Sequence, residues 1–445
     1  MHKKMIFVLM LFPLLLTAQS IPFNVRTGTK FSTSTMIGKV HEDSISYNQL
    51  RVIQEFKIKK FSFGLDLDFL FNEDFQLKKS DWDSFTDYLD KIYYLRYGKT
   101  GEPVYLHYGG LPRMSHGNGL VMLNYSNMIF YPNYRQNGII LGSTLGDYPK
   151  PDITLFSTNL AKNEVLGLMV SVQPIPDNTV KILDQARLGM SYYVDRNQYS
   201  NLKHVVPDSL YQELFTSKKD SANIIGFEYR QPLFAKNKIK VETYSEIAHL
   251  ISGGSAYILP GIFADFDVVK VNLEYRIHGD KFSHMYFDRY YEEDRVTLLF
   301  DDDDLPYLKT KEQSVKEMKA SYGFYGKVEG KIANKLKTSF AWQNMYGEEL
   351  KTGKSMWFDI KVDTQYKRLE NVKFAYSKTK VEKLRLGEIA VPRAHMSMEA
   401  TMSVNEKRRL FVIGKYSEKY KDKEGGINWW RDTKRSVSVG VKYVF

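Results

Sequence analysis

The chain has 445 residues, 43% of them hydrophobic, and its 63 Lys and Arg against 52 Asp and Glu give a formal net charge of +11. It contains no cysteine, which excludes disulfide scaffolds, thiolate metal sites, cysteine nucleophiles and a lipid-modified N-terminal cysteine. A mean hydropathy of −0.39 excludes a bundle of membrane helices, whereas 31 Tyr and 27 Phe exclude a disordered chain. The architectures that the length still allows are roughly two or three soluble domains or one large β architecture.

The N-terminus has the pattern of a secretory signal. Lys3 and Lys4 precede an apolar run over residues 5–16, and small or polar residues follow up to Ser20. This run is too short to cross a bilayer as a helix but suits the middle of a signal peptide. We expect residues 1–20 to be a signal peptide, whose loss lowers the net charge from +11 to +9 because it removes Lys3 and Lys4.

Residues 61–71 are the first clear strand, with apolar side chains at every other position and Asp66 and Asp68 between them. The same alternation recurs in residues 267–277, 322–332, 356–367 and 395–404. Alternation over ten or more residues exceeds the roughly five or six residues typical of strands in soluble sheets, and about ten residues is the length that a tilted strand needs to cross a bilayer.

A stretch rich in glycine and asparagine over residues 105–142 has two interpretations. One is an inward-folded segment that narrows a pore, with Arg113, His116 and Arg135 as the constriction. The other, which we favour, is a pair of short strands with a kink and a belt of interfacial tyrosines.

The last ten residues alternate strictly, with apolar or aromatic side chains on one face and small or polar ones on the other. The first face holds Val437, Val439, Val441, Tyr443 and Phe445. This ending resembles the closing strand of Gram-negative outer-membrane β-barrels, a signal read by the barrel assembly machinery. The resemblance implies a porin-like protein in the outer membrane of a Gram-negative bacterium, bounded by lipid and lipopolysaccharide, with Tyr443 and Phe445 as the assembly signal. It identifies no specific family.

The alternation would also fit a secreted soluble sheet, but the export signal, the terminal Phe and the strand length favour a membrane barrel. We predict an all-β fold in which residues 21–445 form a single transmembrane antiparallel up-and-down β-barrel of about 16–20 strands, with about 18 as the best value. Short loop helices are expected at 81–90 and 208–215. With Phe445 at the periplasmic end, strand parity makes 418–435 an extracellular loop and 405–408 a periplasmic turn, and counting back places 292–320 on the periplasmic side.

The polar faces of the predicted strands should line the lumen. The candidate pore-lining residues are Asp66, Asp68, Lys270, Glu274, Arg276, Lys327, Glu329, Lys331, Asp359, Lys361, Asp363, Glu399 and Lys442. Together with Lys367 they comprise seven basic and seven acidic side chains. This sample of the lumen is therefore neutral, and its charge gives no ground to expect an anion-selective channel.

Motifs for catalysis or for cofactor binding are incomplete. Gly98-Lys99-Thr100 lacks the first glycine of a phosphate loop, and no serine completes a Gly-x-Ser-x-Gly elbow. The acidic run 301–304 lacks the spacing of a calcium loop, and a basic stripe interleaved with aromatics, as nucleic-acid binding requires, is missing. We expect no catalytic residue, cofactor, metal or nucleic-acid partner. The sequence does not exclude a hydrolase embedded in the barrel, and it does not predict the oligomeric state.

These features favour a porin-like channel or transport protein for small polar or amphipathic solutes. The alternative is a closed structural or assembly barrel, or a surface-binding barrel, that acts through its loops. An interior filled by Tyr325, Trp357 and inward loops would favour that closed barrel.

Overall fold

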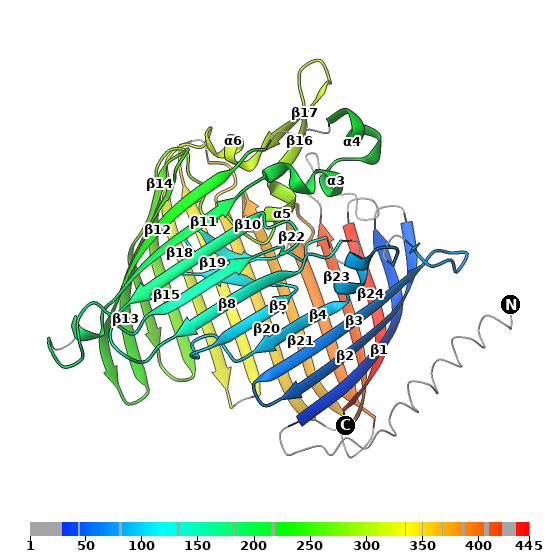
Figure 1. The fold of residues 1–445 in the computed structure, drawn as a ribbon, viewed down its shortest axis with the longest axis horizontal. Helices are drawn as coiled ribbons and strands as arrows, with labels where there is room; N and C mark the ends of the chain where they lie inside the picture. The colour runs from blue at the N-terminus through cyan, green and yellow to red at the C-terminus, as the bar shows by residue number, and fades with distance from the viewer. Residues whose placement is uncertain are drawn as a thin grey trace.

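Twenty antiparallel strands form one closed sheet in the computed structural model (Figure 1). The structure describes residues 29–42, 45–79, 82–130, 134–180, 183–214, 219–333, 335–348, 350–366, 368–384, 388–404, 409–420 and 433–444. The prediction of an all-β antiparallel barrel is therefore confirmed. The strand number lies within the predicted range and exceeds the best value of about 18.

The wall is an uninterrupted series in which each strand pairs with the next. Its first ten strands are β1 (Thr29–Glu42), β2 (Ile45–Ile58), β3 (Phe61–Phe71), β4 (Ile92–Tyr97), β5 (Tyr105–Gly109), β8 (Gly138–Thr144), β9 (Asp152–Ser157), β10 (Val165–Val172), β11 (Arg187–Asp195) and β12 (Ala222–Lys236). The other ten are β13 (Ile239–Leu250), β14 (Ser255–Asp265), β15 (Val269–His278), β18 (Ser321–Ile332), β19 (Leu336–Tyr346), β20 (Lys354–Tyr366), β21 (Leu369–Val381), β22 (Ala394–Ser403), β23 (Leu410–Tyr420) and β24 (Thr433–Val444). Because β24 pairs with β1, the wall has no free edge.

Within the described residues, two hairpins and several short helices do not belong to this wall. The hairpins are β6 (Met114–His116) with β7 (Met122–Tyr125) and β16 (Val296–Phe300) with β17 (Pro306–Thr310). The helices are α2 (Phe85–Leu89), α3 (Leu202–Val205), α4 (Asp208–Leu214), α5 (Tyr291–Asp294), α6 (Lys311–Val315) and the 3-10 turns η3 (Leu183–Gln185) and η4 (Gln198–Asn201). The predicted loop helices thus appear as α2 and α4. Among the described residues, no helix is long and apolar enough to cross a membrane.

The two ends of the barrel differ. Short turns such as 58–61 and 236–239 lie at the end where the C-terminal strand finishes, whereas α3 to α6 and the β16–β17 hairpin crowd the opposite end (Figure 1). The prediction that 292–320 shares the side of the C-terminus is wrong. Seven strands, an odd number, follow that segment, so it and the C-terminus lie at opposite ends. The predicted turn 405–408 and most of 418–435 lie outside the described residues.

The outer surface of the wall is apolar. Val437 and Val439 on β24 are 51% and 52% exposed, and Phe324 on β18 is 57% exposed. Exposed large hydrophobic side chains of this kind occur on strands all around the barrel. Soluble proteins rarely expose such a continuous apolar surface, whereas lipid would cover it.

Candidate functional site

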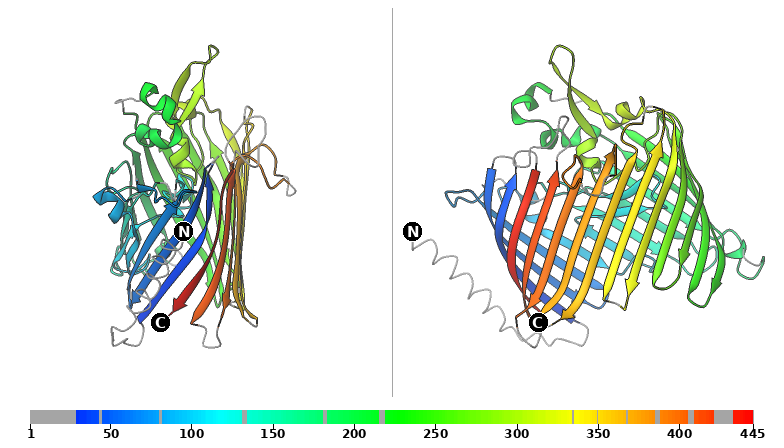
Figure 2. Two further views of the ribbon diagram at one scale, coloured as in Figure 1. Left: turned by 90° about the vertical axis from the view of Figure 1, so that its right-hand side faces the viewer. Right: turned by 180° about the vertical axis from the view of Figure 1, so that it is seen from behind.

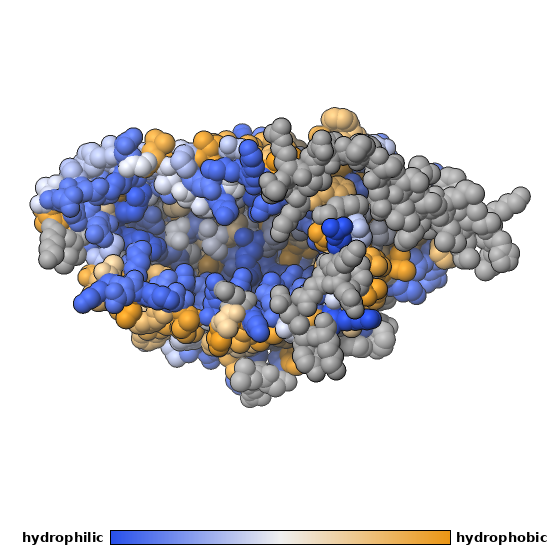
Figure 3. Space-filling model, turned by 90° about the horizontal axis from the view of Figure 1, so that it is seen from below, coloured by the Kyte–Doolittle hydropathy of each residue, from blue (hydrophilic) through white to orange (hydrophobic). Residues whose placement is uncertain are grey.

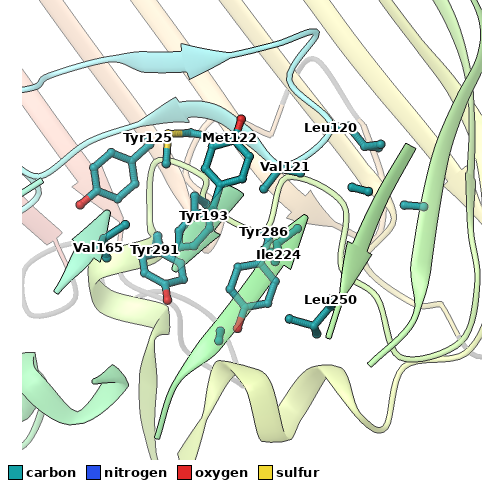
Figure 4. Packing of buried hydrophobic residues seen from close by; sticks show 14 of the residues in the cluster. Leu120, Val121, Met122, Tyr125, Val165, Tyr193, Ile224, Leu250, Tyr286 and Tyr291 are labelled. Carbon is teal, nitrogen blue, oxygen red and sulfur yellow. The ribbon is translucent and has the colours of Figure 1, made fainter. Parts of the chain in front are cut away.

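The interior of the flattened barrel (Figure 2) is divided into an apolar part and a charged part. The apolar part begins with residues 110–130 and 134–137, which leave the wall between β5 and β8 and fold inward. Their hairpin packs with residues 282–291 against the inner faces of β9 to β14. Figure 4 shows Met122, Tyr125, Tyr193, Tyr286 and Tyr291 converging in this core, where each is at most 1% exposed. We call residues 110–130, 134–137 and 279–320 together the inserted segments.

The structure thus corrects the interpretation that we favoured for the stretch over residues 105–142. The wall does contain two short strands, β5 and β8, but the chain between them folds inside the barrel. The turn of its hairpin uses Gly117 and Gly119, whose φ angles of +59° and +86° favour glycine. Asn118 between them fixes the hairpin to the wall, because its backbone N–H donates to Glu246 at 2.8 Å and its side-chain oxygen accepts from Arg230 at 2.6 Å.

A buried charge network holds the two inserted segments together. The Arg295 guanidinium is 1% exposed and contacts Asp195 at 2.7 Å, Glu292 at 3.0 Å and Glu164 at 3.3 Å. Tyr125 from the β6–β7 hairpin donates a hydrogen bond to Glu292. The surrounding carboxylates hold the pKa of Arg295 well above its ordinary value despite its burial, which by itself lowers that pKa. The acidic residues near 292–294 are therefore bound to cations of the protein.

A second network joins the inserted segments to the end of β21 and to the connection between β21 and β22. Arg393 contacts Asp294 at 2.8 Å, and Lys380 contacts Asp288 at 2.8 Å. Lys311 at the start of α6 lies nearby, 6% exposed, with its ammonium 4.8 Å from the centre of the Tyr291 ring. Burial, then the neighbouring Lys380, lowers the pKa of Lys311 to about 7.

The charged part of the interior is a cavity of about 890 Å³ lined by residues of β1, β2, β4, β15, β18 to β24 and the inserted segments. Seen from the C-terminal end, the molecule is hollowed and hydrophilic residues line the hollow (Figure 3). Ten Lys or Arg residues line the cavity against five Asp or Glu residues. The cavity lining is therefore net positive, in contrast to the neutral sample of residues taken from the predicted strands.

Six of the thirteen candidate pore-lining residues line this cavity: Lys270, Glu329, Lys331, Asp359, Lys361 and Glu399. The other seven form contacts at the wall. Asp66 binds Arg51, Asp68 accepts from Gln49, Glu274 binds Arg276, Lys327 binds Glu329, Asp363 binds Lys361, and Lys442 binds Glu55. Glu274 and Arg276 are 3% and 0% exposed. The Tyr244 hydroxyl donates to Glu274 at 2.7 Å, and the Arg276 guanidinium lies 4.3 Å from the centre of the Tyr325 ring.

The three constriction candidates occupy three different positions in the structure. Arg113 reaches the cavity wall and contacts Asp359 on β20 at 3.1 Å. His116 does not face the cavity: it is 7% exposed, with its ring centre 4.8 Å from that of Phe156. Arg135 lies against the wall, where it donates to the backbone oxygens of Asp66 and Asp90 at 3.0 Å. Arg113 thus contacts a residue that lines the cavity, although none of the three candidates is itself part of the lining.

Seven basic cavity residues were absent from the sequence prediction: Arg51, Arg289, Lys337, Lys373, Lys415, Lys419 and Arg435. Most of them lie on β2, β19, β21, β23 and β24. Extending the alternation of 356–367 and 395–404 into the neighbouring strands would have found Lys337, Lys373 and Lys415, which stand opposite predicted residues. Arg289 belongs to an inserted segment, and sequence alternation gives no signal for it.

Of the two residues of the predicted assembly signal, Tyr443 belongs to the described part of the chain. Tyr443 lies on β24 opposite Thr33 of β1 and Leu410 of β23, so it belongs to the seam where the wall closes. Phe445 and the predicted signal peptide, residues 1–20, lie outside the described residues.

The chain matches no protein-family profile and no curated protein sequence. Among solved structures it is similar to the ferric enterobactin receptor of Pseudomonas aeruginosa, with 8% identity, a TM-score of 0.39 and coverage of 95% of this chain and 81% of that one. It is also similar to OccK11 of P. aeruginosa (9% identity, TM-score 0.35, coverage 94% and 96%) and OccAB2 of Acinetobacter baumannii (11%, 0.34, 94% and 97%). At these identities and scores the likeness does not extend to function.

Proposed function

We propose that this protein is a porin-like transport barrel that carries small polar solutes across the outer membrane through its lumen. The observation that carries the proposal is the charged cavity of about 890 Å³ inside a closed barrel with an apolar exterior. A cavity of this volume is in the range of small-molecule sites, roughly 300–1,000 Å³. Its lining of charges and hydroxyls would replace part of the hydration of a polar solute.

The outer surface supports a membrane location. Outward side chains such as Leu155 on β9, Phe227 on β12 and Val439 on β24 are each about half exposed, which would suit the lipid face of a transmembrane barrel. Short turns at one end and long connections at the other match the usual asymmetry of outer-membrane barrels. We accordingly propose lipid and lipopolysaccharide as the surroundings, and the barrel assembly machinery as a partner of the β24 strand.

The alternative of a closed barrel also has an observation in its favour. Tyr325 and Trp357 are 6% and 7% exposed inside the barrel and pack with Met285 of an inserted segment. Passage past these two side chains, which lie on β18 and β20, would require the inserted segments to move. The charged half supports transport, whereas the apolar half supports a barrel that acts through its loops.

Catalysis has less support than transport. His395 and Ser397 both line the cavity, but among the described residues the structure shows no hydrogen bond between them. A hydrolase would need a nucleophile and a base in contact. We propose that solutes pass without chemical change, so His395→Ala should leave any lipid hydrolysis by the purified protein unchanged.

Single-channel recording in planar bilayers tests the proposed function. We expect conductance steps from the intact protein, and larger or more frequent steps when residues 112–126, which hold the β6–β7 hairpin, are replaced by a short glycine–serine linker. A matched control replaces residues 301–304 at the tip of the β16–β17 hairpin, outside the cavity, with the same linker. Absence of steps from both the intact protein and the hairpin variant, at any protein load, would refute transport through the lumen.

A further inference from the structure

Four lysines stand side by side across four neighbouring strands of the cavity wall. Lys331 on β18 is directly opposite Lys337 on β19, which is opposite Lys361 on β20, which is opposite Lys373 on β21. All four line the cavity. We call them the lysine row. Like charges directly opposite one another destabilise a sheet, so the row costs stability unless an anion lies against it.

The row continues over two more strands with one carboxylate between lysines. Lys373 is opposite Glu399 on β22, and Glu399 is opposite Lys415 on β23. Glu399 contacts Lys373 at 2.6 Å and Lys415 at 3.2 Å, so one carboxylate is shared by two ammonium groups. Lys361 has a separate partner in Asp363 at 2.9 Å. The negative charges at this level are therefore fewer than the positive ones.

Every acidic residue of the cavity lining is already bound to a cation of the protein. Asp267, Glu329, Asp359, Glu399 and Glu418 contact Lys238, Lys327, Arg113, Lys373 and Arg435 respectively. By contrast, within the part of the chain that the structure describes, Lys331, Lys337 and Arg289 form no ion pair. The unbalanced charge of the cavity is thus positive and faces the solute space.

We propose that the lysine row binds small anionic solutes that carry carboxylate or phosphate groups, and that these are the solutes the barrel transports. The binding part rests on the cavity alone, and the transport part rests on the proposed function. Ammonium groups bind oxyanions through charge-assisted hydrogen bonds, which are stronger inside a cavity than in bulk water. A row that spans four strands, about 4.8 Å apart, matches solutes with two or more anionic groups better than single ions.

Equilibrium dialysis with radiolabelled citrate tests the binding on the full-length protein in detergent, where no transport is needed. The test variant replaces Lys337, Lys361 and Lys373 with Gln, and the matched control replaces Lys59, Lys99 and Lys319, which lie in turns or connections outside the cavity, with Gln. Both variants change the net charge equally. We expect the test variant to bind citrate at least about tenfold more weakly than the wild type, and the control to bind within about twofold of it.

Inorganic phosphate should compete with citrate, an equal concentration of sucrose should not, and binding should weaken as salt rises. Failure of the wild type to bind citrate or phosphate, or an equal loss in both triple variants, would overturn the inference. Native folding of each variant is checked by its heat-dependent mobility in gels. If the test variant unfolds, the single variant Lys337→Glu replaces it, and we again expect citrate binding at least about tenfold weaker than that of the wild type. Citrate binding without bilayer conductance would refute transport alone, and conductance without citrate binding would refute the lysine row alone.

Discussion

Arg113 contacts Asp359 at 3.1 Å although 246 residues separate them in the sequence. The contact joins the inserted chain between β5 and β6 to the β20 strand of the cavity wall. Both side chains are partly exposed, at 49% and 32%, so solvent screens the pair. It therefore positions the inserted chain over the cavity without fixing it strongly.

The Arg113–Asp359 pair should contribute little to stability. We expect Arg113→Ala and Asp359→Ala each to lower the free energy of unfolding by less than about 1 kcal/mol, with a coupling of about 0.2–1 kcal/mol between them. Guanidinium unfolding of the two single variants and the double variant in detergent measures this coupling. Strictly additive effects would show that the two residues do not interact in solution.

Arg295 should matter far more, because it is buried among three carboxylates. Arg295→Met leaves those carboxylates without their cation, so we expect the inserted segments to lose about 3–5 kcal/mol of stability against local opening. Hydrogen exchange should rise in 110–130 and 279–320 while the wall strands stay protected. Lys309→Met is the control. It also removes a cation from an ion pair, but its partner Glu317 is 69% exposed, so water solvates the carboxylate that is left. Unchanged exchange in the Arg295 variant would contradict a structural role for the network.

The inserted hairpin should loosen in acid because of His116. Burial lowers the pKa of His116 to about 4, so its neutral form stabilises the fold fully above pH 6.5, the ordinary value, and this contribution is lost as the pH falls from 6.5 towards 4. The loss should reach about 3 kcal/mol. In His116→Gln the free energy of unfolding should fall less steeply over this range. The control is His249→Gln, at an exposed position, which should leave the slope of the unfolding free energy against pH as in the wild type. Equal slopes in all three proteins would show that His116 is not protected from protons.

Repulsion within the lysine row predicts that one substitution stabilises the barrel. Lys337 faces Lys331 on one side and Lys361 on the other, so Lys337→Gln should raise the free energy of unfolding by about 0.2–1 kcal/mol per opposed pair at low salt. The gain should shrink at about 1 M salt, where the screening length is about 3 Å. Lys59→Gln, in a turn at the same end of the barrel, should show no such gain. Denaturant unfolding at both salt concentrations decides between these outcomes.

Strands whose two faces differ in polarity were predictable from sequence. The bounds of β3 agree residue for residue, and those of β18 and β22 differ by one residue. The strands from β9 to β12 were missed because their inner faces meet the inserted apolar core. Phe156, Tyr193 and Ile224 point into that core, and exposed apolar side chains occupy the outer face of the same strands. Polar residues therefore do not alternate with apolar ones in these strands. Two apolar faces give no period of two to detect.

The candidate site was predictable only in part, because its charge depends on register. Lys331 and Lys361 were identified from alternation, but nothing in the sequence states that Lys337 stands between them. A shift by one residue in the β18–β19 pairing would turn Lys337 to the other face. The inserted segments likewise depend on distant contacts, such as Arg295 with Asp195, which are 100 residues apart.

The pairing of β24 with β1 has a consequence for how the molecule forms. Every other pair of wall strands joins neighbours along the chain, but this seam brings Met36 opposite Gly440 and Gly38 opposite Ser438. Its closure carries the largest loop entropy in the fold and has to wait until the last strand has been synthesised. Since β1 begins and β24 finishes at the same end of the barrel, a circular permutant that links these two strands and is opened at the 58–61 turn would keep the same twenty strands. It would make the β24–β1 pairing local and move the long-range closure to β2 and β3.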